Sequence, residues 1–303
     1  MMDLTRFQQK TKELLPDLEL YMNEPLSKHT SFRIGGPAEV LAFPHNPDEL
    51  AKILNVSALL DCKPAILGAG TNILAPDEGL TGLVICLKDG IGGINRVDNT
   101  HICVGAGVSM ARAATFAASC GLTGLEFAHG IPGSIGGGVY MNAGAYGGEL
   151  CQVVQWVDVM DLSGNIRRLS NEEMRFSYRH SVLEEDYGIV IRVQFQLNEG
   201  REEDIRGYMQ ELMQRRRTSQ PLDKPSAGSA FKRPVGGYAG ALIESAGLKG
   251  YQVGGAAVSQ KHAGFVVNLG DATANDVKQV LLDVSNKVFE NSGIRLEPEV
   301  RIW

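Results

Sequence analysis

The sequence lacks the features that define several whole classes of protein. Lys and Arg number 29 against 35 Asp and Glu, so no surplus of positive charge is available for binding a phosphate backbone. No uninterrupted apolar run reaches the roughly 18 residues that a membrane-spanning helix needs. Residues Met1 to Leu20 are polar and show no secretory signal. We therefore expect a soluble cytoplasmic protein whose partners include neither nucleic acid nor a membrane.

Cysteine is scarce and is not arranged for cross-linking. The five cysteines are Cys62, Cys86, Cys103, Cys120 and Cys151, an odd number with wide spacing and no Cys-x-x-Cys pair. This pattern argues against a disulfide framework and against a zinc site. We expect each cysteine to be a small buried apolar residue in a reducing compartment, and we expect no bound metal.

The remaining composition is that of a folded protein with mixed secondary structure. Of the 303 residues, 44% are hydrophobic and 21% are charged, which is enough for two or three domains with real cores. Capping signals and apolar spacing predict helices at 47–54, 108–120, 203–217, 238–246 and 273–289. Short apolar or alternating runs predict strands at 64–67, 82–87, 102–104, 156–160, 166–169, 188–197, 251–258, 264–268 and 300–302. A polar break at 198–202 is the best candidate for a domain boundary.

Glycine is the residue in excess, with 36 copies or about 12% of the chain against a usual share of about 7%. One glycine pair, Gly68-Ala69-Gly70, follows a predicted strand and precedes Thr71-Asn72. Its bare backbone suits a phosphate or pyrophosphate, and an ordinary tight turn is an equal alternative. It is not a Rossmann loop, because Ile73 stands where the third glycine would be and Pro76 stops any following helix. Gly105-Ala106-Gly107 fails in the same way.

A second segment is far richer in glycine. Eight of the 19 residues from Gly130 to Gly148 are glycine, and they are mixed with Ile, Val, Met and Tyr. A flexible linker would have Gly and Ser without these apolar side chains, so we expect packed backbone with a large, flat ligand against it. A tightly packed glycine corner without a ligand is the alternative.

Three shorter segments carry side chains with chemical potential. Arg179, after Tyr178, offers a planar and permanently charged fork for a carboxylate. Ser229 is surrounded by the small residues Ala227, Gly228 and Ala230, although no Gly-x-Ser-x-Gly elbow supports it as a nucleophile. Glu299 lies among apolar neighbours near the carboxyl end, where it is either paired with an arginine or kept for catalysis.

These segments, in this order, resemble the UDP-N-acetylenolpyruvoylglucosamine reductase family. The resemblance runs from about Asn23 to Trp303 and takes in Thr30 to Ala38, Tyr178-Arg179, Ala227-Gly228-Ser229 and Pro298 to Arg301 besides the two glycine-rich segments. The short connection from Ser181 to Gly188 is like the form of the family that lacks a longer tyrosine-bearing loop. Arg233 departs from the members that have Asn after the Phe-Lys pair, so no substrate role is carried over to it.

The resemblance implies an α+β fold with a two-lobed FAD-binding domain of the vanillyl-alcohol-oxidase (PCMH) type and a smaller α+β substrate domain. We expect an N-terminal extension over 1–22, the FAD-binding domain over 23–197 with lobes of about 23–88 and 89–197, and the substrate-binding domain over 198–303. We also expect a monomer.

The resemblance further implies an NADPH-dependent flavoenzyme of peptidoglycan precursor synthesis, with noncovalent FAD and a UDP-sugar substrate. By position, Arg179 and Glu299 would stabilise the enol form of the substrate, and Ser229 would donate a proton. Substrate contacts would come from Tyr178, Lys261 and His262. The expected FAD contacts are Gly68, Ala69, Gly70, Thr71, Asn72, Ile73, Ile131, Pro132, Gly133, Ser134, Gly136, Gly137, Asn142, Ala143 and Gly144.

Two other interpretations stay open at the level of sequence. One is an oxidase of the same fold that passes electrons to oxygen, with flavin tethered to a histidine such as His129. The other is a flavin or nucleotide-sugar binding module without catalytic activity, which would lack Arg179, Ser229 or Glu299. All three residues are present.

Overall fold

The computed structural model describes residues 3–303, and by its internal contacts the chain divides into two compact units. Unit 1 comprises residues up to 23, 39–69 and 81–214, whereas unit 2 comprises 24–38, 70–80 and 215–303. Each unit is therefore assembled from separated stretches of sequence. Compact units of this kind are a geometric division, so the functional domains expected from the sequence stay a prediction.

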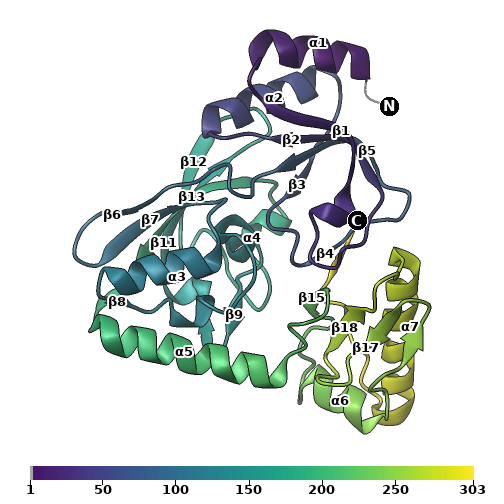
Figure 1. Ribbon diagram of the computed structural model, residues 1–303. Coiled ribbons are helices and arrows are strands. Elements are labelled where there is room, and N and C mark those ends of the chain that lie inside the picture. The colour runs from purple at the N-terminus through teal and green to yellow at the C-terminus, as the bar shows by residue number, and fades with distance from the viewer. Residues whose placement is uncertain (1–2) are drawn as a thin grey trace. The chain divides into compact units, whose positions relative to one another are not determined.

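Unit 1 contains two sheets, each with its own hydrophobic core (Figure 1). The first sheet has the order β1-β2-β5-β3, and its strands are β1 (Glu19–Pro25), β2 (Pro37–Phe43), β5 (Leu80–Cys86) and β3 (Ala65–Leu67). The second has the order β12-β11-β13-β7-β6, and its strands are β12 (Ile166–Ser170), β11 (Val154–Met160), β13 (Ile189–Gln196), β7 (His101–Gly105) and β6 (Ile94–Arg96). The mixed α+β architecture agrees with the expected fold class.

Helices and short strand pairs complete unit 1. The helices are α1 (Leu4–Leu14), α2 (Pro47–Leu59), α3 (Met110–Ser119), α4 (Ile135–Tyr140) and α5 (Glu202–Ser219), the last of which continues into unit 2. The short pairs are β9 (Gly144–Ala145) with β10 (Gly148–Glu149), and β8 (Leu122–Thr123) with β14 (Asn198–Glu199). Short 3-10 helices of unit 1 lie at Glu126–Ala128, Leu150–Gln152 and Val182–Glu184, and another, Leu26–Lys28, belongs to unit 2.

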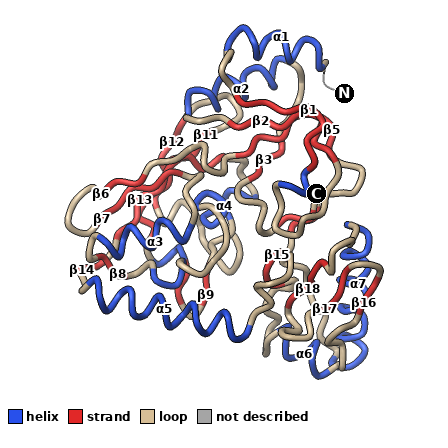
Figure 2. The backbone as a smooth tube through the Cα atoms, viewed as in Figure 1, coloured by secondary structure: helices blue, strands red, loops and turns tan. Residues whose placement is uncertain are grey.

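Unit 2 is a four-stranded antiparallel sheet packed against a long helix (Figure 2). The strand order is β15-β18-β17-β16, with β15 (Ser226–Ser229), β18 (Phe265–Asn268), β17 (Ala256–Val258) and β16 (Gln252–Val253). Its helices are α6 (Ala239–Ser245) and α7 (Ala274–Ser292). A separate parallel pair joins β4 (Ile73–Leu74) to β19 (Arg301–Ile302).

Local sequence signals explain many of these elements. Asn46 caps α2 by accepting a hydrogen bond from Glu49 N, and Pro47 occupies the first helical position as predicted. The expected capping box of Thr273 and Asp276 opens α7. The predicted hairpin is confirmed, because Trp156 pairs with Ser170 and Met160 with Ile166.

Two parts of the chain are more ordered than the sequence predicted. The amino-terminal stretch contains α1, whose Phe7 is fully buried and which packs beside α2 in the first core (Figure 1). The glycine-rich segment contains the helix α4, with Ile135 and Val139 facing the second core. The sequence prediction missed α1 because few of its residues are apolar, and it missed α4 because half of its residues are glycine, which disfavours a helix.

The cysteines are unpaired in the structure, and two of them are buried. Burial raises the pKa of the Cys86 thiol to about 11 and also raises the pKa of Cys103. Cys62, Cys120 and Cys151 are only partly buried, so the expectation of five buried residues is met fully by two.

A buried aspartate in the second sheet of unit 1 forms ion pairs with arginines on both neighbouring strands. Asp158 accepts hydrogen bonds from Arg168 (Nε 2.8 Å) and from Arg192 (Nη2 2.7 Å), and its side chain is 5% exposed. Arg168 also stacks on Trp156, with its guanidinium carbon 3.5 Å from the ring centroid. Burial would raise the pKa of Asp158, but the two arginines outweigh burial and hold the pKa below its ordinary value.

We expect Asp158→Asn to lower the free energy of unfolding by about 2 kcal/mol at neutral pH, because two arginines lose their charged partner. A depressed native pKa gives stability above the unfolded pKa that is lost as pH falls through the native value. The difference in the free energy of unfolding between wild type and variant should therefore become smaller below pH ~4. Urea unfolding at several pH values measures this. Asp186→Asn, which breaks the exposed pair with Arg167, is the control and should change little; an unchanged difference at low pH would contradict the expectation.

Candidate active site

The two glycine-rich segments meet in unit 1, although some 65 residues separate them in the sequence. A Cβ atom added to Gly68 would lie 2.6 Å from Ser134 Oγ and 4.0 Å from Gly137 Cα. Gly137 is exposed, and a Cβ there would meet only Ser134 Oγ, at 3.5 Å. The result is a surface of main chain with few side chains above it, which is the kind of surface a phosphate group can approach closely.

Hydrogen bonds to neighbouring segments fix the main chain of this surface. The Cys86 thiol lies 3.7 Å from the carbonyl of Gly68, and Gly136 N donates to Ala106 O (2.8 Å). Ser134 is buried and pairs with Ser109 in an isolated β-bridge, while Gly133 O accepts from Met110 N (2.9 Å). The predicted residues Gly68, Gly133, Ser134, Gly136 and Gly137 thus form one continuous framework.

The second glycine pair has a different role. A Cβ on Gly105 would clash with the carbonyl of Gly92, and one on Gly107 with the carbonyl of Leu87. Both glycines are therefore required by tight backbone packing, and the tight-turn alternative holds for this pair.

The Gly68 loop continues into unit 2, where it joins the segments of Ser229 and Glu299. Asn72 Nδ2 donates to Glu299 O (3.1 Å), and Arg301 N donates to Asn72 O (2.9 Å). Ser31 N donates to Gly70 O (2.9 Å), and Ser31 Oγ donates to Ser226 O (2.6 Å). Asn72 and Ser31 thereby connect this loop to the segment of Glu299 and to β15, which ends at Ser229. The sequence motif from Thr30 to Ala38 was the signal for Ser31, which was not predicted as a site residue.

Ser229, the last residue of β15, and Glu299, which lies in a loop before β19, are 70 residues apart in the sequence, and backbone hydrogen bonds join the segments that follow and precede them in unit 2. Glu299 N donates to Ala230 O (2.9 Å), Lys232 N donates to Glu297 O (2.9 Å), and Phe231 bridges Pro298. Ser229 is exposed, and its hydroxyl makes no hydrogen bond to any residue within 3–303. Gly228 has φ +76°, so the chain turns sharply just before the serine.

Arg179 belongs to unit 1, in a tight turn that joins Ser177 and His180 by two backbone hydrogen bonds. The residue has φ +56°, a left-handed conformation that non-glycine residues rarely adopt. Its guanidinium donates to Gly144 O (3.2 Å) and lies 4.9 Å from the Tyr178 ring centroid. The structure therefore holds this arginine beside the glycine-rich segment of the same unit.

The other residues expected at the site have these surroundings. Lys261 Nζ donates to Arg217 O (2.6 Å) near the end of α5, and His262 Nδ1 accepts from Gly264 N (3.1 Å). Burial lowers the pKa of His262, whose ring packs edge-on against Phe265. Thr71 and Ile73 lie in the Gly68 loop, Ile131 packs on the second core of unit 1, Pro132 is exposed, and Ala143 donates from its backbone to Gly138 O.

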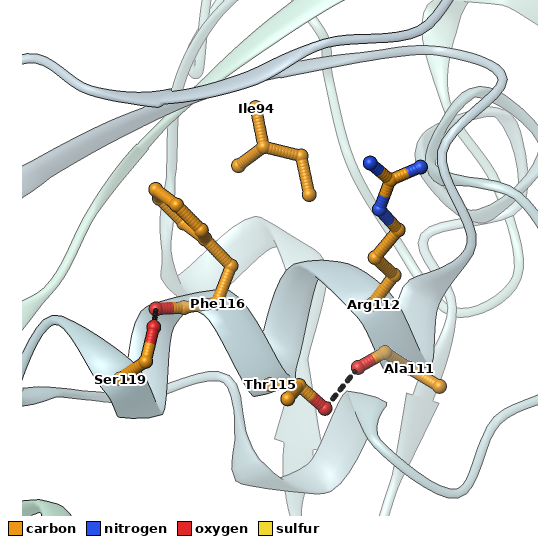
Figure 3. A pocket seen from close by; sticks show the side chains of 6 residues that line it. All are labelled: Ile94, Ala111, Arg112, Thr115, Phe116 and Ser119. Carbon is orange, nitrogen blue, oxygen red and sulfur yellow. Dashed lines mark hydrogen bonds between the residues drawn. The ribbon is translucent and has the colours of Figure 1, made fainter.

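A surface groove of about 570 Å³ lies apart from all of these residues, between α3 and Ile94 of β6 (Figure 3). Arg112 and Phe116 reach toward Ile94 on one side of the helix (Figure 3). Thr115 and Ser119 turn their hydroxyls back to the carbonyls of Ala111 and Phe116, both at 2.8 Å. The groove thus offers one cation and apolar surface, and it contains none of the expected site residues.

The described part of the chain contains no cluster of three or more His, Cys, Asp or Glu residues suited to a metal ion. Within 3–303, no helix is both long enough and apolar enough to cross a membrane.

Comparison with known proteins first defines the class. Residues 38–170 match the model of an FAD binding domain, and 220–303 match the C-terminal domain of UDP-N-acetylenolpyruvoylglucosamine reductase. An alkyldihydroxyacetonephosphate synthase structure has the same fold at 14% identity, with a TM-score of 0.50 over 65% of this chain and 41% of that one. The protein is an α+β flavoprotein with an FAD-binding domain followed by a C-terminal domain of this reductase type.

Closer relatives define the family. UDP-N-acetylenolpyruvoylglucosamine reductase of Caldanaerobacter subterraneus is 50% identical over 97% of this chain and 96% of its own, and that of Lactococcus lactis is 46% identical over 96% of each. The crystal structure of the Thermus caldophilus enzyme is 37% identical, covers 94% of this chain and 98% of its own, and has a TM-score of 0.79. The chain belongs to the UDP-N-acetylenolpyruvoylglucosamine reductase family.

Proposed function

We propose that this chain is the NADPH-dependent flavoenzyme that reduces the enolpyruvyl ether of UDP-N-acetylglucosamine-enolpyruvate to UDP-N-acetylmuramate, a step in peptidoglycan precursor synthesis. The observation that carries this proposal is identity of 44–50% with reductases over nearly the whole chain, together with the FAD-binding domain. The alternatives of an oxidase and of a silent binding module are not favoured by these relatives.

The residues present fit FAD. The bare backbone around Gly68 and Gly137 supplies close approach for phosphates, and the residues from Gly70 to Ile73 follow Gly68 closely along the chain. When bound, FAD would supply the chemistry of hydride transfer from NADPH to the methylene carbon of the substrate. We assign the two glycine-rich segments to holding it.

Residues of the chain would stabilise the negative charge that develops on the substrate and would supply the proton. The double bond gains a hydride at its methylene carbon and a proton at the adjacent carbon, so NADPH and one proton are consumed for each product formed. As the hydride adds, negative charge spreads onto the substrate carboxylate, and the guanidinium of Arg179 would stabilise it with paired N–H groups. Ser229, whose hydroxyl makes no hydrogen bond within the described chain, would donate the proton.

Glu299 would support this step from the loop whose backbone bonds to Ala230, the residue after Ser229. Its backbone N–H donates to Ala230 O and its carbonyl accepts from Asn72 Nδ2, so the main chain of Glu299 is fixed beside the segment of the serine. A carboxyl group there can stabilise the enol form by a hydrogen bond. Tyr178, Lys261 and His262 are proposed as substrate contacts, although Lys261 and His262 already bond to backbone groups in the structure.

We place the reaction in the cytoplasm and expect the enzyme to act as a monomer. NADPH is a reductant of the reducing compartment, and all five cysteines are unpaired. The molecular mass in solution, measured by light scattering, tests the monomer.

We expect the purified protein to be yellow with FAD that is released by heat or acid. The glycine-rich surface provides many weak backbone contacts, which hold a cofactor without a covalent bond. Absorbance of the supernatant after denaturation measures release. Flavin that stays with the precipitated protein would instead support a tether such as His129, whose Nδ1 is buried without a hydrogen-bond partner in the described chain. Colourless protein that takes up no FAD would contradict the cofactor assignment.

The activity itself is tested by NADPH consumption in the presence and absence of the enolpyruvyl UDP-sugar. We expect consumption to need the sugar and the product to be two hydrogen masses heavier than it. Consumption that depends only on oxygen would favour the oxidase.

A further inference from the structure

The turn that carries Arg179 is strained and needs support from outside itself. Its two backbone hydrogen bonds, Ser177 N to His180 O (3.1 Å) and His180 N to Ser177 O (3.2 Å), close a loop with Arg179 at φ +56°. A left-handed conformation costs a residue with a side chain roughly 1–2 kcal/mol. A turn held only by its own two bonds would therefore relax readily, and the guanidinium would move with it.

Asn142 supplies such support from the glycine-rich segment. Its side-chain nitrogen donates to Ser177 O (3.0 Å) and to Glu149 Oε2 (3.1 Å), and its side-chain oxygen accepts from Cys151 N (2.9 Å). Asn142 is 1% exposed. Both amide hydrogens are therefore committed inside the protein, one of them to the turn of Arg179.

Further bonds tie the same turn to the same segment. Ser181 Oγ, which is fully buried, donates to Tyr140 O (2.8 Å). The Arg179 guanidinium donates to Gly144 O (3.2 Å). Ser177 at the start of the turn, Arg179 within it and Ser181 just after it are thus all hydrogen-bonded to residues 140–144. The bond to Ser177 comes from Asn142.

We propose that Asn142 is a positioning residue for reduction of the enolpyruvyl substrate: its carboxamide holds the Ser177 carbonyl and so fixes the orientation of Arg179. This inference rests on the proposed function of Arg179. It gives Asn142 a role different from the FAD contact that the sequence resemblance implied, because both of its N–H groups bond to protein. Glu149 and Cys151 in turn fix the orientation of the Asn142 carboxamide.

The variant that isolates this role is Asn142→Gly. Asn142 has φ +42°, which glycine adopts without strain, so the substitution removes the carboxamide and little else. We expect flavin reoxidation by the enolpyruvyl substrate to slow by about 10–100-fold, the usual effect of a small misplacement of a catalytic group. Asn171→Ala is the matched control. Its Nδ2 donates to the carbonyls of Cys151 (2.8 Å) and Val154 (2.7 Å) without touching the turn, and we expect less than a ~2-fold effect.

A double-mutant cycle with Arg179→Ala separates positioning from general damage. If Asn142 acts through Arg179, Asn142→Gly should have almost no further effect once Arg179 is alanine. Equal losses in both backgrounds, or no loss in either, would overturn the proposal. If Arg179→Ala alone leaves the rate unchanged, the proposed role of Arg179 is wrong. If Arg179→Ala slows the reaction severely while Asn142→Gly has no effect, only the positioning role of Asn142 is wrong.

Hydrogen exchange provides a readout that does not depend on activity. The amides of Ser177 and His180 should lose protection in Asn142→Gly and keep it in Asn171→Ala. Unchanged protection in Asn142→Gly would contradict the proposal. If Asn142→Gly is isolated without FAD and excess FAD restores the full rate, Asn142 is a cofactor contact and the positioning role is wrong. Asn142→Asp, which keeps the size but loses both donors, repeats the test should the glycine variant fold poorly.

Discussion

Replacing Ser229 with alanine is expected to leave reduction of the flavin by NADPH intact while slowing its reoxidation by the enolpyruvyl substrate by a factor of about 10²–10⁴. Only the second half-reaction needs a proton on carbon, so the proton donor can be removed from one step without affecting the other. The exposed Ser229 hydroxyl makes no hydrogen bond within residues 3–303, so its loss breaks no hydrogen bond of the described chain.

Stopped-flow traces of the two half-reactions measure this directly. Ser245→Ala, which removes a hydroxyl from α6 of the same unit, is the control and should change neither step. Equal losses in both steps for Ser229→Ala would indicate a damaged flavin site. An unchanged second step would exclude Ser229 as the acid, leaving it as a small residue in a sharp turn after Gly228.

Arg179→Lys is expected to slow the same step by about 10²–10³-fold although the charge is kept. Lysine replaces a planar fork by a point charge, so it cannot pair with a carboxylate through two parallel hydrogen bonds. Lysine also cannot lie against the Tyr178 ring as a plane while it donates to Gly144 O.

Arg175→Lys is the matched control for this variant. Arg175 also has a positive φ, +45°, and it forms an exposed pair with Glu185 at 2.9 Å. An exposed pair contributes little to stability, so the control should keep nearly full activity. Wild-type kinetics in Arg179→Lys would remove Arg179 from the site, and equal losses in both variants would mean that the segment as a whole is sensitive.

The strongest local signals in the sequence predicted elements correctly, and the reason is that they act within a few residues. Asn46-Pro47 and Thr273 to Asp276 satisfy backbone donors at the start of their own helices, whatever surrounds them. The hairpin from Val154 to Ser170 follows from alternation and a short turn. Elements that depend on distant partners were missed. α1 forms because Phe7 finds a place beside α2, and α4 forms within a run of glycines because Ile135 and Val139 reach a core built by other strands.

The sequence proposes residues for the candidate site but gives no information on the hydrogen bonds that connect them. Order and residue type pointed to Arg179, Ser229 and Glu299, but no sequence pattern indicates that Glu299 N meets Ala230 O or that Asn72 bonds to Glu299 O. Asn142 shows the limit most clearly. A motif match suggested a cofactor contact, whereas its three hydrogen bonds are to Ser177, Glu149 and Cys151, seven to 35 residues away. Such long-range bonds are set by the fold as a whole.

The central claim is that hydride from NADPH passes through FAD on this chain to an enolpyruvyl carbon. Sequential anaerobic mixing of the purified enzyme tests it most directly: first with NADPH, then with UDP-N-acetylglucosamine-enolpyruvate, while the flavin absorbance is followed. We predict that absorbance falls after the first mixing and returns after the second, with one UDP-N-acetylmuramate formed for each flavin reoxidised. Absorbance that stays low with the sugar and returns only when oxygen is admitted would contradict the account.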